Sequence, residues 1–162
     1  MRKLILFTVV AAALGMSATR AQAQEDYATA TLTVGPLLFI DVDISDLQFN
    51  PTATDFSAGV VGGVTNSVAT KGNVSYRLTI EADDPTFTYT GSLTPPTKPS
   101  TELHWSADGG AFNPLANGTA QDVGTFVPGQ YTTAMSYEIE LQWDEDLEGT
   151  YELPITYTVV AP

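Results

Sequence analysis

The strongest constraint on the fold is a hydrophobic period of two residues that recurs along most of the chain. In residues 73–81, 134–143 and 150–160, apolar side chains stand at every second position and polar or charged ones stand between them. Alternation of this kind predicts β-strands with one face on a core and the other in water. No segment after residue 23 has the period of a long amphipathic helix.

Weaker strand signals and frequent turn signals fill most of the remaining sequence. Between the predicted strands lie pairs rich in Gly, Pro, Asn and Asp, about ten residues apart, which is the spacing of a sandwich. The sequence therefore predicts one all-β domain, an antiparallel β-sandwich. The weaker strands are expected at residues 27–34, 37–44, 60–70, 86–90, 102–106 and 123–127.

The segment Leu147-Glu148-Gly149-Thr150-Tyr151 refines this prediction. It resembles the corner of fibronectin- and immunoglobulin-type sandwiches, where a tyrosine hydroxyl ties the start of the sixth strand to the preceding turn. The alternative is an ordinary glycine turn beside a core tyrosine. If Tyr151 does begin the sixth strand, no segment remains for a seventh. We then expect either a different strand order or an edge supplied by another chain.

The first 23 residues have the three regions of a secretory signal peptide. Arg2 and Lys3 are basic, residues 4–16 are apolar, and Ala21-Gln22-Ala23 offers small side chains at the cleavage positions. We therefore predict a signal peptide at 1–23, a single domain at 24–162, and a secreted or cell-surface location. The alternative is an uncleaved membrane anchor, for which the apolar run is short.

Charge and composition exclude several classes of partner and chemistry. The chain has a net charge of −13, and loss of residues 1–23 leaves three basic residues against nineteen acidic ones, a net charge of −16. Such an acidic surface repels nucleic acid and anionic lipid, so we expect neither partner, and no membrane insertion after cleavage. The absence of cysteine excludes thiol catalysis, thiolate metal sites and iron–sulfur chemistry.

The residues available for catalysis argue against an enzyme. His104 is the sole histidine, and the sequence has no Gly-x-Ser-x-Gly motif to supply an activated serine. A solvent-facing strand histidine is the simpler interpretation. Acidic pairs are numerous, but in the turns of a small sandwich we expect them to face water rather than flank a glycosidic bond.

Calcium is the one cofactor that the acidic residues suggest. Clustered carboxylates suit this hard cation, although neither cluster matches an EF-hand loop. The alternative is that these acids are simply solvated. The candidate ligands are Asp41, Asp43, Asp46, Asp144 and Asp146.

The two tryptophans offer a second type of binding site. Trp143 continues the apolar face of residues 134–143, so we expect it in the core. Trp105 fits its strand less well, and it is the better candidate for a surface residue that stacks on sugar rings.

Residues 24–34 are the most suggestive for assembly. Ala28, Ala30, Leu32 and Val34 alternate there with tyrosine and threonine. This segment is expected either to form the first strand of its own domain or to complete a neighbour's sheet by strand addition.

Three segments resemble bacterial surface proteins of the immunoglobulin-like class, such as WxL-type cell-wall proteins and secreted pilin-like sandwiches. They are residues 28–34, 47–50 and 149–162. No Trp-x-Leu pair occurs, and no functional residue carries over. The resemblance implies a structural or cell-surface protein, with fibre assembly by strand exchange as one form of it. The alternative is a non-catalytic module that binds carbohydrate or calcium.

Overall fold

The structure is a computed structural model that describes residues 29–162. The predicted signal peptide and residues 24–28 of the predicted first strand lie outside this range. The chain divides into two compact units, Met1–Thr33 and Val34–Pro162, and all the described helices and strands belong to the second.

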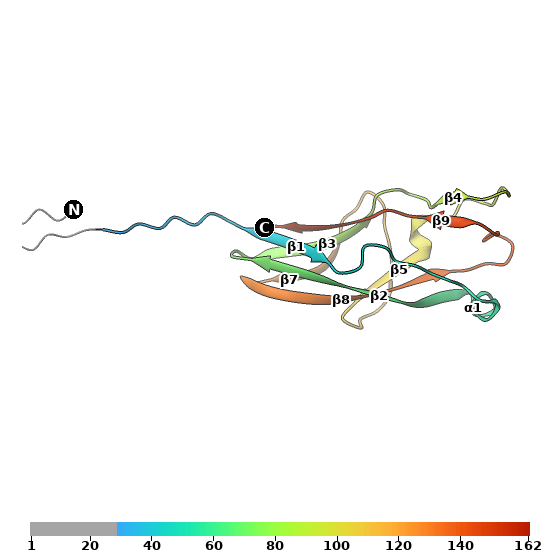
Figure 1. The fold of residues 1–162 in the computed structure, drawn as a ribbon, viewed down its shortest axis with the longest axis horizontal. Helices are drawn as coiled ribbons and strands as arrows, with labels where there is room; N and C mark the ends of the chain where they lie inside the picture. The colour runs from blue at the N-terminus through green and yellow to red at the C-terminus, as the bar shows by residue number, and fades with distance from the viewer. Residues whose placement is uncertain (1–28) are drawn as a thin grey trace, which may run out of the picture. The chain divides into compact units, whose positions relative to one another are not determined.

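The second unit is an all-β fold with one short α-helix and one turn of 3-10 helix (Figure 1). Its elements are β1 (Leu38–Val42), α1 (Ala53–Ala58), β2 (Val60–Gly72), β3 (Tyr76–Ala82), β4 (Thr88–Thr90), η1 (Ser100–Glu102), β5 (Leu103–Ala107), β6 (Asn113–Pro114), β7 (Gln121–Phe126), β8 (Gly129–Glu140), β9 (Thr150–Glu152) and β10 (Ile155–Val160).

The strands form three antiparallel sheets. The largest has the order β1-β2-β8-β5-β6, the second has the order β10-β3-β7, and β4 pairs with β9 in a short ribbon. The long β2–β8 pair carries a bulge between Val61 and Val64, where Gly63 takes a φ of 82° that favours glycine. This arrangement confirms the predicted all-β class with antiparallel sheets.

The predicted strands are found with three differences. The strand expected at 150–160 is divided into β9 and β10 at Leu153-Pro154, since proline has no N–H for a sheet ladder. The strand expected at 134–143 begins earlier and ends at Glu140. Residues 29–34, expected to lie in a strand, have no strand conformation.

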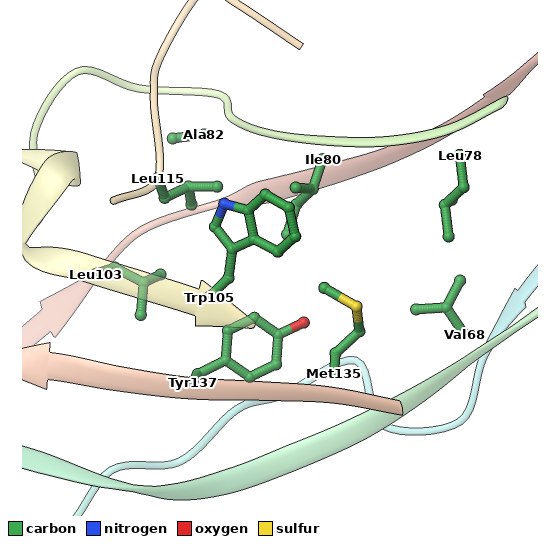
Figure 2. Packing of buried hydrophobic residues seen from close by; sticks show 9 residues of the cluster. All are labelled: Val68, Leu78, Ile80, Ala82, Leu103, Trp105, Leu115, Met135 and Tyr137. Carbon is green, nitrogen blue, oxygen red and sulfur yellow. The ribbon is translucent and has the colours of Figure 1, made fainter. Parts of the chain in front are cut away.

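The core lies between the two larger sheets (Figure 2). Alternate residues of β2, β5 and β8 meet alternate residues of β3 across this layer, as expected for sheets that each have one buried face. The buried cluster is Val68, Leu78, Ile80, Ala82, Leu103, Trp105, Leu115, Met135 and Tyr137.

A chain of hydrogen bonds crosses the core and joins the two sheets. The hydroxyl of Tyr137 on β8 contacts that of Tyr157 on β10, and it also donates to Oδ1 of Asn66 on β2 at 3.1 Å. Asn66 in turn donates from Nδ2 to the carbonyl of Ile44 at 3.1 Å. Burial raises the pKa of Tyr157 to about 12, an effect that hydrogen bonding to Asn66 partly offsets.

Helix α1 was not predicted from the sequence, although its ends carry recognisable signals. Thr52 caps the helix through a capping box with Asp55, and Gly59 ends it in the left-handed region at φ 77°. The hydrogen bonds from Thr52 lower the pKa of Asp55. At six residues the helix is too short to show an amphipathic period.

Candidate strand-acceptor groove

The two larger sheets each end in a strand that is paired on one side. Within residues 29–162, β1 pairs with β2 alone and β10 pairs with β3 alone. The two strands lie against each other, with the C-terminus beside β1 (Figure 1). An edge strand carries backbone N–H and C=O groups that are free to pair with another chain.

After β1 the chain leaves the sheet and runs toward α1 as an extended segment, residues 43–51 (Figure 1). Asp43 anchors its start, because its N–H donates to the carbonyl of Ser67 at 3.1 Å and its carboxylate accepts from the N–H of Ser67 at 2.6 Å. Beyond Ile44, no backbone hydrogen bond joins residues 45–51 to any other described part of the chain. Within the described residues, the backbone of this segment therefore has no strand partner on either side.

A groove of about 1210 Å³ lies between residues 42–51 on one side and residues 146–157 on the other. Its lining is largely apolar, with Leu47 and Phe49 from the first wall and Leu153, Ile155 and Tyr157 from the second. Further apolar lining comes from the large sheet and the residue just after β8, namely Val61, Leu103, Ile139 and Leu141.

Four acidic residues and one basic residue are among the lining of the groove. Asp46, Glu148 and Glu152 are exposed, and the single lysine of the lining, Lys98, is fully engaged. Its Nζ lies 2.7 Å from Glu102 Oε2 and 2.7 Å from Asp146 Oδ1, and it also donates to the carbonyl of Glu140 at 2.8 Å. The lysine side chain is 5% exposed, so it neutralises these carboxylates and presents little positive charge to a ligand.

Tyr151 makes the contact predicted for the corner, in the second wall of the groove. Its hydroxyl accepts a hydrogen bond from the N–H of Leu147 at 2.9 Å. Burial raises the pKa of this tyrosine. Tyr151 belongs to the β4–β9 ribbon, where its ring lies 5.0 Å from that of Tyr89.

The structure reverses the sequence interpretation of the two tryptophans. Trp105 is 5% exposed in the core, while Trp143 is 63% exposed beyond the end of β8, with its ring centroid 4.7 Å from that of Phe56 on α1. The expected alternation fails because β8 ends at Glu140. Phe56 and Trp143 both line the α1 end of the groove.

The five calcium candidates have separate surroundings. Asp43 accepts a hydrogen bond from the backbone N–H of Ser67, and Asp46 accepts one from the side-chain amide of Gln48 at 2.7 Å. Asp146 forms an ion pair with Lys98. Asp41 and Asp144 are exposed. Within residues 29–162, no group of three or more acidic or histidine side chains is arranged to hold a metal ion.

His104 lies on β5 with carboxylates on both sides of its ring. Nδ1 is 3.6 Å from Glu138 and Nε2 is 3.3 Å from Glu140. Ser106, the serine nearest to it in sequence, donates its hydroxyl to the carbonyl of Gly110 at 2.8 Å. The ring therefore lies between two carboxylates, and Ser106 is bonded elsewhere.

Sequence reasoning did not find the groove. Its first wall contains Leu47-Gln48-Phe49-Asn50, whose apolar positions alternate and point two side chains toward the core. This alternation predicts that Leu47 and Phe49 face the core, but it does not indicate that the backbone of the segment lacks a strand partner.

None of the helices in residues 29–162 is long and apolar enough to cross a membrane. The sequence matches no protein-family model and no curated protein. The groove and the edge strands are therefore the features on which a function has to be argued.

Proposed function

We propose that this chain is an exported structural protein of the cell surface or extracellular space, whose copies associate by exchange of β-strands. The observation that carries the proposal is the free edge of β10 beside an apolar groove. Long, unprotected edges are avoided in most soluble proteins because they recruit other strands. Strand addition uses such an edge, with backbone hydrogen bonds for affinity and side-chain pockets for specificity.

Export and an immunoglobulin-like type of sandwich belong to the same proposal. The signal-like residues 1–23 support export, and the hydrogen bond from Leu147 to the Tyr151 hydroxyl supports the immunoglobulin-like type. The domain is then 24–162, with segment 24–34 as the strand that leaves it. No catalytic role is proposed, since His104 faces two glutamates.

Negative-stain electron microscopy and size-exclusion chromatography of the exported protein test the proposal. We expect fibres or large oligomers that disappear when residues 24–34 are deleted. Mass spectrometry should give Gln24 as the new N-terminus. A strictly monomeric protein, unchanged in size by the deletion, would contradict assembly by strand exchange.

The exposed ring of Trp143, which lies tilted against that of Phe56, favours a second candidate, a non-catalytic carbohydrate-binding module. An exposed tryptophan ring is a common platform for sugars, and acidic side chains nearby accept hydrogen bonds from hydroxyl groups. Calorimetry against a glycan panel tests it, with Trp143→Ala as the variant and Ca²⁺ as a separate ligand. If no sugar and no Ca²⁺ produces heat or raises the melting temperature, both forms of the module are wrong.

A further inference from the structure

We infer that the groove between residues 44–51 and 153–157 is the acceptor site for residues 27–34 of a second copy of this chain. This inference rests on the proposed function and identifies the partner, the site and the face of the donor strand that enters it.

The first argument is that backbone groups on both sides of the groove lack strand partners. Residues 45–51 make no backbone hydrogen bond to another described segment, and β10 is paired on the β3 side only. A strand inserted between them would add hydrogen bonds on both of its edges. A small apolar ligand would satisfy neither edge, because it has no backbone amides.

The second argument is one of length. The segment from Ile44 to Pro51 has eight residues, and the segment 27–34 also has eight. Both span about 26 Å when extended, at about 3.3 Å per residue. The groove extends along the first wall from Val42 to Pro51, so a donor of this length fits beside that wall.

The third argument is chemical complementarity. Residues 27–34 carry no charge, although the chain as a whole has a net charge of −13. A neutral strand can enter a groove with an acidic rim without the repulsion that an acidic strand would meet. Its Ala28, Ala30, Leu32 and Val34 form one apolar face for the groove floor, while the threonines of the other face remain toward water.

The fourth observation concerns the segment that leads into β1. Asn73, in the turn after β2, fixes the chain just before β1. Its Nδ2 donates to the carbonyl of Gly35 at 2.8 Å, its Oδ1 accepts from the N–H of Leu37 at 2.7 Å, and its own N–H donates to the carbonyl of Leu37 at 3.2 Å.

These bonds hold residues 35–37 in line with β1. Gly35 is not among the glycines with positive φ, and residues 29–37 contain no turn, although hairpins with two-residue loops use positive φ. We therefore take a second copy as the donor, and the chain with both cysteine substitutions, described below, tests that assignment.

Disulfide trapping tests the inference in the full chain, which has no native cysteine to interfere. One preparation carries Leu32→Cys in the donor segment, and a second carries Leu47→Cys in the groove. Leu153→Cys in the opposite wall serves as a second acceptor, in case Leu47→Cys does not fold. Two matched controls are Thr31→Cys, on the other face of the donor, and Thr132→Cys, on the exposed face of β8.

After mixing and oxidation, we expect Leu32→Cys to form disulfide-linked dimers with either groove variant, several-fold more than Thr31→Cys does. We expect Thr132→Cys to give only the level of random collision. Equal yields from Leu32→Cys and Thr31→Cys with every acceptor variant, Thr132→Cys included, would overturn the groove as the acceptor. A chain carrying both Leu32→Cys and Leu47→Cys that closes its disulfide as a monomer would overturn the assignment to a second copy.

Two outcomes separate this inference from the proposed function. Fibres that form without any groove disulfide would leave strand exchange standing and refute this acceptor site. Groove disulfides between purified copies, with no fibres on the producing cells, would confirm the acceptor and refute fibre assembly. Native mass spectrometry of the exported protein is the last check, since a co-purified apolar molecule lost on Leu47→Asp would assign the groove to that molecule instead.

Discussion

The closed core and the open groove are two parts of the same layer between the sheets, and they differ in how their backbones are paired. In the closed core, side chains come from strands that mostly have neighbours on both sides, and the central residues are fully buried. In the groove, Leu47 and Phe49 come from a segment without a strand partner and remain half exposed. Alternating apolar residues therefore supply a buried face only where the backbone is also paired.

The largest expected difference between the two regions is in their tryptophans. Trp105→Ala should lower the free energy of unfolding by about 3–5 kcal/mol, because it empties a large site in the closed core. Trp143→Ala should cost about 1 kcal/mol, the value of its stack on Phe56. Urea unfolding of both variants measures this. Equal losses would mean that Trp143 is as buried in solution as Trp105.

Lys98 should give the next largest effect, since it is buried among acids at the groove. Lys98→Met should cost about 3 kcal/mol, because the carboxylates of Asp146 and Glu102 are left without their cation. Lys71→Met, at an exposed position on β2, is the matched control and should change stability by less than about 0.5 kcal/mol.

A double-mutant cycle sharpens the result for Lys98. The pair Lys98→Met and Asp146→Leu together should cost less than the sum of the two single changes, since the double variant leaves one fewer unpaired charge. Additive losses in thermal or urea unfolding would show that the ion pair is not formed in solution.

Tyr157 joins the core to the groove and should make the fold sensitive to alkali. Its folded pKa of about 12 lies above the ordinary value of 10.0, so the folded state keeps its proton to a higher pH than the unfolded chain. The contribution of protonated Tyr157 to the free energy of unfolding should therefore be fully present below pH 10. It should fall by about 2 to 3 kcal/mol as pH rises from 10 to 12. Tyr157→Phe should reduce this slope in urea unfolding at a series of pH values, and an unchanged slope would contradict the assignment.

The same two regions show which features of the fold could be predicted from the sequence. Alternation of apolar and polar residues predicted the all-β fold class, the antiparallel pairing and the buried faces of β3 and β8. It could do so because a sheet with one buried face imposes a period of two residues. The corner bond of Tyr151 followed from a local motif. Both successes rest on short-range information.

The errors come from information that the local sequence does not contain. Whether the strand continues past Glu140 depends on where the neighbouring strand ends. The predicted strand was extended to residue 143, and Trp143 was therefore wrongly expected in the core. The groove depends on which backbone edges find partners among residues far apart in the chain. Segment 29–34 has a strand-like sequence but is not part of any sheet in the described residues.

One of the smallest expected effects is that of Leu47→Ala in the groove, which we compare with the same substitution at Leu78 in the closed core. Leu78 is fully buried on β3, so Leu78→Ala should cost about 2–5 kcal/mol through lost contacts and a new cavity. Leu47 is half exposed in the first wall of the groove, and Leu47→Ala should cost about 1 kcal/mol, because it buries less area and enlarges a space already open to water. Urea unfolding of the unassembled protein measures both. If Leu47→Ala costs as much as Leu78→Ala, the groove is closed by the chain itself in solution, and no space remains there for a partner strand.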